Sequence, residues 1–429
     1  MLNFTVRKLA LQKNLDMMPF SNLRMNSFTM DKSRFSYFAN SFQFKSLSTK
    51  VSDTLFSYSL HSAIKIDGNL FNNATSFNTQ QIYQQFSAFN CYFLHCKNNI
   101  SGGAFTSNGR DAIVHFERCF FENCISEKEA GAIYIKDGSL HLIDSTFKGC
   151  LAYASAQAIY ISSYPRNSIR LQRTSIDRCP VIAPDLQGSV VHSISGEQTV
   201  VETNVTHSKI VSGSGSIKSI KPYSFDGRYC CISFNHGTSA LAIFHNTTIE
   251  GPIILDYYNI INNTLEGDDL IQTDSLIYLR NSVIADNMVI VEVTSYTPAP
   301  TKKLSKLSMV SSKKKKEEKT VAPTPTKSIF IRLEHCGLDA NHAELLKNTD
   351  VCSGCNKIEG KYTLYQIPAA KTPGIRKATA LPPPKEYSPQ ILMLCPFMTI
   401  LIILIGLVMR TTNCQSTDDY VQDEFVQSN

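Results

Sequence analysis

The sequence of 429 residues predicts an all-β fold, a single-stranded parallel β-helix (solenoid) of about nine or more rungs, followed by one transmembrane helix. Three observations predict it. The chain repeats one residue pattern every 24 to 29 residues. Equivalent positions of successive repeats are apolar with strand periodicity, and one long apolar stretch near the C-terminus has no charge.

The repeat occurs nine times between Cys91 and Asn341. A small or polar anchor is followed two positions on by a large apolar residue and five positions on by Cys, Asn or Ser. The intervals are 28, 26, 29, 29, 27, 28, 24 and 54 residues, so the last is two periods or one period with an insertion. Such a period is typical of stacked coils. The anchors are Cys91, Cys119, Ser145, Thr174, Thr203, Cys230, Tyr258, Ser282 and Cys336.

Apolar residues five and three positions before each anchor alternate as in a strand with one buried face. Strands are therefore expected within residues 112–119, 275–282 and 328–336. Neighbouring rungs of a parallel β-helix lie about 4.8 Å apart, so each column is buried against the next rung. Gln198 and Gly227 break the columns. An antiparallel sandwich with chance spacing is the alternative, and it predicts no stacked columns.

Glycine-alanine segments follow the first three anchors, at residues 102–105, 130–134 and 156–160, and residues 120–123 read FFEN. This stretch, from Cys91 to Ile161, resembles the polymorphic outer membrane protein (Pmp-like) repeat of surface proteins, whose marks are GGA[ILV] and FxxN. The resemblance implies a right-handed β-helix displayed at a cell surface, with adhesive or antigenic roles. Bacterial members end in an outer-membrane β-barrel, whereas this chain ends in a hydrophobic stretch.

That stretch, residues 391–409, holds nineteen uncharged residues, closed by Arg410. As a helix it measures about 28 Å, close to the roughly 30 Å hydrocarbon core of a bilayer. The alternative is a buried core helix. The predicted organisation is degenerate rungs or an N-terminal cap (1–85), a β-helix (86–355) with a disordered insertion (294–327), a Pro-rich juxtamembrane spacer (356–390), the span (391–409) and a short cytoplasmic tail (410–429).

The orientation signals conflict. Lysines and arginines precede the span, which favours a cytosolic N-terminal domain, and the N-terminus lacks the apolar run of a secretory signal. Eleven of thirteen cysteines before the span and the sequons favour an oxidising, extracellular side. We expect a plasma-membrane protein with an extracellular N-terminal domain, and the alternative is a tail-anchored protein facing the cytosol. The candidate glycosylation sites are Asn73, Asn99, Asn204, Asn246 and Asn262.

Two polar segments could bind partners. The insertion holds nine lysines and two glutamates, and its run Lys313, Lys314, Lys315 and Lys316 could attract an anionic partner, although a solvated loop is the simpler interpretation. No stacking aromatic residues accompany it, so nucleic acid is not expected. Tyr420 lies among acidic residues of the tail and could recruit cytoplasmic sorting partners or be phosphorylated, although the tail could also be a solvated end.

The cysteines fall in columns. The position five after the anchor is Cys in four rungs and then mostly Asn, whose stacked amides would form a hydrogen-bonded ladder. The rung spacing allows disulfides such as Cys96 to Cys124, and buried free thiols are the alternative. Near the end of the repeats, one set has zinc-knuckle spacing, but a disulfide-tied cap explains it as well, and no metal site is predicted. The set is His335, Cys336, His342, Cys352 and Cys355.

No catalytic constellation emerges. The aspartates share no column offset, and the sequence has no phosphate loop, HExxH or GxSxG motif. We therefore expect no catalytic, cofactor-binding or metal-ligating residues. The expected function is a single-pass cell-surface protein whose β-helix is a non-catalytic adhesion, binding or antigenic surface for host-cell or matrix glycans or proteins. The alternative is a membrane-tethered lyase or hydrolase acting on polysaccharide.

Overall fold

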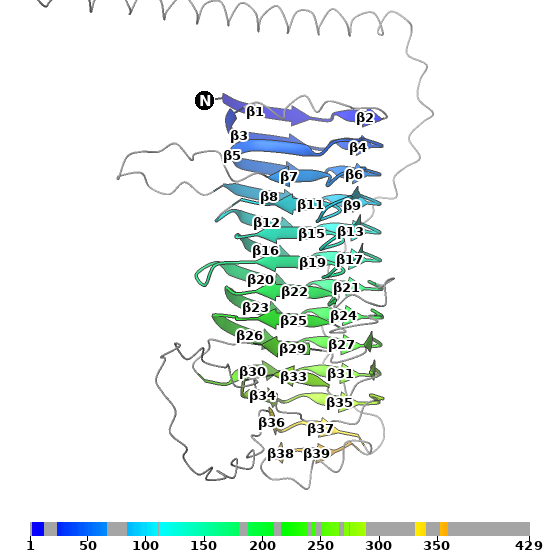
Figure 1. Ribbon diagram of the computed structural model, residues 1–429, viewed down its shortest axis with the longest axis vertical. Coiled ribbons are helices and arrows are strands. Elements are labelled where there is room, and N and C mark those ends of the chain that lie inside the picture. Colours follow the sequence, from blue (N-terminus) through cyan, green and yellow to red (C-terminus); the bar gives the residue numbers. More distant parts are fainter. Residues whose placement is uncertain are drawn as a thin grey trace, which may run out of the picture. The chain divides into compact units, whose positions relative to one another are not determined.

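The computed structural model describes residues 2–12, 24–66, 84–109, 111–179, 188–209, 216–237, 242–245, 251–265, 270–273, 275–288, 331–339 and 352–358. All of them belong to the first of two units into which the chain divides, Met1–Pro373. Every regular element in this part is a β-strand, and short strands stack in sequence order along one axis (Figure 1). The predicted strands within 112–119, 275–282 and 328–336 are confirmed.

Each coil carries strands on up to three faces, and all strand pairings between coils are parallel. The strands of face 1 are β1 (Leu2–Arg7), β3 (Arg24–Asp31), β5 (Phe42–Ser52), β8 (Gln85–Phe89), β12 (Ile113–Glu117), β16 (Ser139–Ile143), β20 (Ser168–Gln172), β23 (Glu197–Val201), β26 (Ser224–Arg228), β30 (Ile253–Asp256), β34 (Ile277–Arg280), β36 (Ile331–Glu334) and β38 (Cys352–Ser353).

Face 2 is a 13-stranded sheet of short strands. Its strands are β2 (Ala10–Gln12), β4 (Arg34–Ser36), β6 (Leu55–Ser57), β9 (Tyr92–Leu94), β13 (Phe120–Glu122), β17 (Thr146–Lys148), β21 (Ser175–Asp177), β24 (Asn204–Thr206), β27 (Cys231–Ser233), β31 (Asn259–Ile261), β35 (Val283–Ala285), β37 (Gly337–Leu338) and β39 (Asn356–Lys357).

Face 3 joins face 1 through β5, which pairs with β7 by its first residues and with β8 by its last. Its further strands are β7 (Ile64–Ile66), β11 (Phe105–Ser107), β15 (Ile133–Lys136), β19 (Ile159–Ser162), β22 (Val191–Ile194), β25 (Ile217–Ile220), β29 (Ala242–His245) and β33 (Ile271–Thr273). Two small sheets follow face 2, formed by β10 (Lys97–Asn98), β14 (Ile125–Ser126) and β18 (Leu151–Ala152), and by β28 (His236–Gly237) and β32 (Thr264–Leu265).

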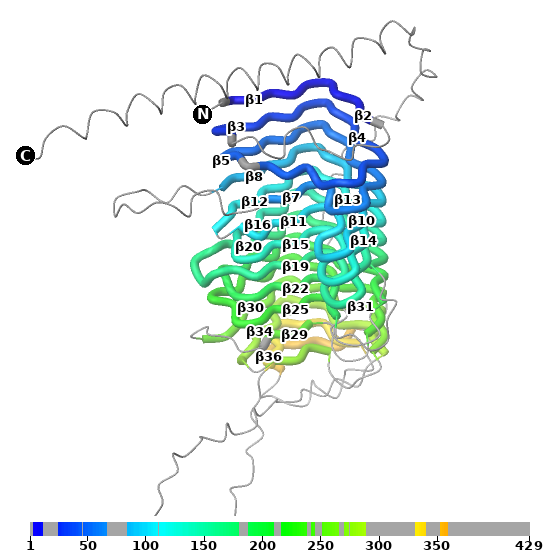
Figure 2. The backbone as a smooth tube through the Cα atoms, turned by 45° about the horizontal axis from the view of Figure 1, so that its top comes forward, coloured from blue at the N-terminus to red at the C-terminus, as the bar shows by residue number. Residues whose placement is uncertain are grey.

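The chain winds from face 3 to face 1 to face 2 and then into the next coil (Figure 2). The register keeps like residues in line, as where Phe105, Ile133 and Ile159 lie opposite one another on face 3. A parallel β-helix is therefore confirmed for the described residues. Strands β1 to β7 belong to the same sheets, so the coils begin well before Cys91.

The corner between faces 1 and 2 is the constant feature of the coil. In all thirteen described coils, two residues separate the two strands. The first adopts a left-handed conformation, as at Arg118 (φ 53°), and the second is the anchor, as at Cys119, whose side chain is buried. The sequence repeat is therefore the signature of this corner. The corners identify three earlier anchors, Leu9, Ser33 and Thr54, and a later one, Cys355.

The core consists of side-chain columns that run from coil to coil. On face 2, the rings of Phe93, Phe121 and Phe147 stack with centroids 4.8 and 4.5 Å apart, and all three are fully buried. Burying each ring contributes about 1.5–3 kcal/mol, and each ring pair about 0.5–1.5 kcal/mol more. The column continues as aliphatic residues in later coils, as the sequence predicted.

Neighbouring side chains compensate for both breaks in the columns. Gln198 is buried, and its Oε1 accepts hydrogen bonds from the hydroxyls of Ser193 and Ser219, both at 2.8 Å. At Gly227 a Cβ atom would lie 2.4 Å from the hydroxyl oxygen of Tyr258. The large anchor Tyr258 therefore occupies the space that a side chain at position 227 would need.

Candidate binding groove

A hollow of about 680 Å³ lies against the N-terminal coils, within the 300–1,000 Å³ range of ligand sites. Its walls come from four successive coils, whose strands β5, β7, β11 and β15 pair in this order on face 3. Most of the lining groups are amides and hydroxyls. The lining residues are Asn40, Ser41, Gln43, His61, Ser62, Lys65, Asn98, Ile100, Ser101, Thr106, Asn108, Lys128, Glu129 and Tyr134.

The glycine-alanine segment forms the turn beside this groove. Gly102 has a φ of 73°, and a Cβ atom there would lie 2.2 Å from the carbonyl oxygen of Phe105. At Gly103 a Cβ atom would lie 2.3 Å from the carbonyl oxygen of Gly131 in the next coil. Only glycine permits both the left-handed turn and this close approach between coils.

A buried hydrogen-bond network fixes the base of the groove. The Asn98 amide donates to the Ser62 hydroxyl at 2.7 Å, and the Ser62 hydroxyl lies 2.6 Å from that of Thr106. Thr106 also donates to the carbonyl oxygen of Ser101 at 2.6 Å. Each of these side chains is at most 9% exposed. Because the members hold one another, their orientation is set before any ligand arrives.

Glu129 and Tyr134 complete the groove at its last coil, near β15. The Ser101 hydroxyl donates to Oε2 of Glu129 at 2.9 Å. Burial, assisted by the charge of Glu129, raises the pKa of Tyr134 to about 12, so its phenol stays protonated at neutral pH. One face of the Tyr134 ring stacks on Tyr160, with centroids 5.2 Å apart and planes inclined by 14°. Sequence analysis did not identify this site, and the glycine-alanine segments beside it are its one sequence signal.

A second hollow, of about 550 Å³, lies beside face 1 and includes Asp111, Arg166 and Asn167 in its lining. Next to it, Nε2 of His141 lies 2.5 Å from the hydroxyl of Ser168. Burial lowers the pKa of His141, with the neighbouring His115 and Arg170 acting in the same direction. In each of the two hollows one lining residue carries a carboxylate, Glu129 in the first and Asp111 in the second.

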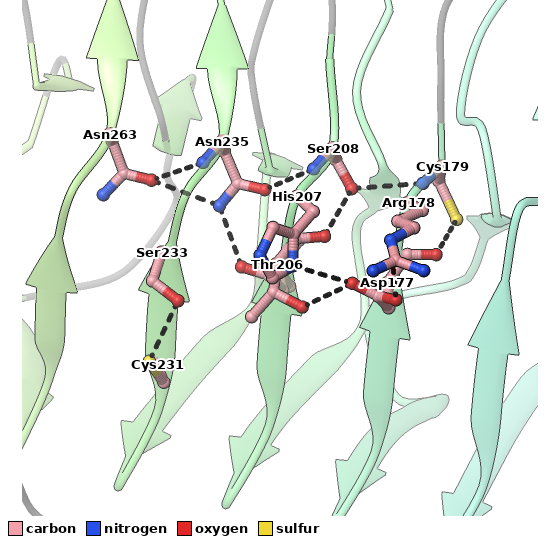
Figure 3. Close-up of polar contacts among 11 residues, drawn as sticks. Asp177, Arg178, Cys179, Thr206, His207, Ser208, Cys231, Ser233, Asn235 and Asn263 are labelled. Carbon is pink, nitrogen blue, oxygen red and sulfur yellow. Dashed lines mark hydrogen bonds and ion pairs between the residues drawn. The ribbon is translucent and has the colours of Figure 1, made fainter.

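The predicted asparagine ladder is confirmed in the described coils (Figure 3). Oδ1 of Asn263 accepts from the backbone N–H of Asn235 at 3.0 Å, and Oδ1 of Asn235 accepts from the N–H of Ser208 at 2.9 Å. Asn287 continues the ladder to Asn263. Each amide also donates to a carbonyl of the preceding coil, as Asn263 does to Ile232 at 2.9 Å.

The thiols of the same column use the same acceptor. Sγ of Cys124 donates to the carbonyl oxygen of Phe93 at 3.4 Å, and Cys150 donates to that of Phe121 at 3.8 Å. Cys and Asn can therefore replace one another in this column, because both place a donor at the equivalent backbone carbonyl of the preceding coil. Burial, the largest cause, raises the pKa of Cys124 and Cys179 well above the usual range.

All eleven described cysteines are free in the structure. The coil geometry also explains the zinc-knuckle spacing. Cys355 is an anchor, one coil beyond the anchor Cys336, and Cys352 lies opposite Leu333 on face 1. Among the described residues, no group of three or more His, Cys, Asp or Glu could hold a metal ion, and His342 lies outside them. The adjacent cysteines Cys230 and Cys231 differ, because Cys230 is buried and Cys231 is partly exposed.

The glycosylation candidates have different surroundings. Asn99 is exposed, next to the groove residues Asn98 and Ile100. Asn262 is half-buried at a left-handed corner, with φ 53°. Asn204 is half-buried, and its Oδ1 is buried without a hydrogen-bond partner. Asn73 and Asn246 lie outside the described residues.

Other predicted features also lie outside the described residues. They are the lysine run Lys313 to Lys316 with its insertion, the apolar stretch 391–409, and Tyr420. Within the described ranges, the structure has no helix that is long and apolar enough to cross a membrane. Comparison with known proteins yields no match to a family model, a curated protein or a solved structure.

Proposed function

We propose that this chain is a single-pass cell-surface protein whose right-handed β-helix is an extracellular, non-catalytic binding surface. The observation that carries the proposal is the groove on the N-terminal coils. It has the volume of a ligand site, and the network of Ser62, Asn98 and Thr106 holds its polar groups in place. The Pmp-like repeat resemblance, the sequons and the apolar stretch 391–409 support the surface location.

Binding is favoured over polysaccharide cleavage by the composition of the two hollows. Hydrolysis of a glycosidic bond uses two carboxyl groups about 5–9 Å apart. Each hollow offers one, Glu129 or Asp111. A single carboxylate surrounded by amide and hydroxyl groups is suited to binding a ligand through hydrogen bonds.

Surface accessibility tests the proposal. The full-length protein with a tag after Asn429 is produced in cells, and unpermeabilised cells are treated with protease and glycosidase. We expect the β-helix to be cleaved or to lose mass as glycan is removed, while the tag stays protected. The variant Asn99→Gln should lose one glycan. A protected, unglycosylated β-helix with an intact tag in these cells would contradict a surface function.

A further inference from the structure

We propose that the groove binds a neutral oligosaccharide, with one sugar ring packed on Tyr134 and its hydroxyls bonded by Glu129 and the asparagine and serine groups around it. This inference rests on the proposed function and names the ligand class of the same site. The juxtaposition that supports it is an aromatic ring, a carboxylate and a fixed set of amides and hydroxyls in one hollow.

The first step concerns the Tyr134 ring. Tyr160 covers one face of that ring from the following coil. On the side of the preceding coil, Tyr134 lies opposite Thr106, a small residue, and both line the groove. This second face is therefore turned toward the hollow. Sugar rings present C–H groups that pack on aromatic faces, and Tyr134 supplies such a face with a protonated hydroxyl at its edge.

The second step concerns hydrogen bonding. A sugar hydroxyl both donates and accepts, so its partners must include strong acceptors and strong donors. Glu129 is the acceptor, already held at one oxygen by Ser101. Asn40, Asn108 and Gln43 place amides, each with a donor and an acceptor group, in the lining. The groove spans four coils, at about 4.8 Å per coil, which accommodates a short chain of sugar rings.

The third step concerns charge. Lys65 and Lys128 line the groove together with the carboxylate of Glu129, which leaves a small formal charge of +1. None of the lining residues is arginine, the side chain that grips carboxylate and sulfate groups through two parallel hydrogen bonds. This composition favours a neutral sugar over an acidic one.

The experiment measures binding of four tetrasaccharides to the purified full-length protein by titration calorimetry. Three are neutral, namely maltotetraose, cellotetraose and chitotetraose, and one is acidic, tetragalacturonate. We expect at least one neutral probe to bind with a Kd of about 1 mM or better. Tyr134→Ala should weaken it about tenfold or more, Tyr134→Phe less than about threefold, and Glu129→Gln about fivefold, as expected for a lost stacking face and a weaker acceptor.

The matched control is Tyr223→Ala, which removes an exposed tyrosine that does not line the groove and should leave the Kd unchanged. If Tyr134→Ala does not fold, Glu129→Gln decides the outcome, because it preserves shape. Absence of neutral binding at 10 mM probe, about ten times the expected Kd, overturns the inference. So does preference for tetragalacturonate, or unchanged binding in both groove variants. These outcomes concern purified protein, so they are separate from the surface-accessibility result that tests the proposed function.

Discussion

At the scale of single residues, the position five after each anchor shows how one backbone acceptor selects a side chain. Asn263 donates to Ile232, Asn235 to Val205, and in earlier coils Cys124 donates to Phe93. An interior carbonyl without a donor is costly, because folding removes it from water. The column therefore accepts Cys and Asn alike in the coils from Cys96 onward.

Replacing Asn263 tests this rule. Asn263→Ala removes the donor to Ile232 and the acceptor of the Asn235 N–H, so we expect a loss of about 2–4 kcal/mol in the free energy of unfolding. Asn263→Cys should cost less, because it restores one donor. The control Asn99→Ala changes an exposed residue and should have little effect on denaturant unfolding. Equal losses for Ala and Cys would contradict the shared role.

The buried thiol of the anchor Cys230 should make the free energy of unfolding depend on pH. Burial raises the pKa of its thiol to about 12, above the usual value of about 9. Between these values the unfolded chain has lost the proton and the folded chain keeps it, so stability falls as the pH rises from about 9 to 12, by up to about 1.4 kcal/mol per pH unit. Serine serves as an anchor at Ser145 and Ser282, so Cys230→Ser should fold and show a shallower alkaline loss in thermal denaturation. An unchanged slope would contradict this assignment.

At the scale of the element, the corners rather than the strands define the repeat. A left-handed residue precedes every anchor, and a second one follows the face 2 strand from β4 to β35. Most of these residues are not glycine, although the conformation costs an ordinary residue roughly 1–2 kcal/mol. Their side chains stack outside the coil, as Tyr37 does on Tyr58 with ring centroids 4.7 Å apart. These stacking contacts and the packing of the core columns stabilise the corners against the cost of the left-handed conformation.

Substitutions at two equivalent corners should change stability by different amounts. Gly149 has a φ of 61°, and a Cβ atom there would lie 2.4 Å from Oδ1 of Asn123, so Gly149→Val should destabilise by about 2–3 kcal/mol. Arg178 is the equivalent residue one coil later, with φ 52°, and Arg178→Gly should change stability by less than about 1 kcal/mol. Melting temperatures of the two variants check this. A comparable loss in both would show that side-chain contacts, not backbone conformation, dominate the corner.

Most anchors could be predicted from the sequence because the corner always has two residues and only a few residue types occupy its buried position. It stopped at Cys91 because the earlier anchors, Leu9, Ser33 and Thr54, lie only 21 to 24 residues apart and the chain then runs 37 residues to Cys91. It could not see that Tyr258 compensates for Gly227, because that contact joins neighbouring coils. The groove was missed for the same reason. Its members, such as Asn98 and Glu129, are common polar residues that only the stacking of four coils brings together.

At the scale of the whole molecule, stability is a sum over neighbouring coils. The aromatic columns of the first coils are fully buried, for example at Phe93 and Phe121, whereas Ile331 near the other end is 7% exposed. The N-terminal half should therefore be the more stable part.

Hydrogen exchange on Phe121→Ala tests this local coupling. The ring stacks between Phe93 and Phe147, and its removal should cost about 3–5 kcal/mol. We expect faster amide exchange in β9, β13 and β17 and unchanged exchange in β34 and β35, several coils away. Ile284→Ala, in the same column near the other end, should give the reverse pattern. Uniformly faster exchange along the chain would mean that the coils unfold as one unit.

The invariant two-residue corner also makes the coil a modular unit. A segment that runs from one anchor to the residue before the next, such as residues 119–144, begins and ends at equivalent points of the coil. Its removal joins the left-handed residue of one corner to the anchor of the next, so later strands keep their places in the coil. Length can thus change by whole coils through deletion or tandem duplication, without redesign of the junction. A shortened protein lacking residues 119–144 would lose the Glu129 and Tyr134 wall of the groove while keeping the architecture.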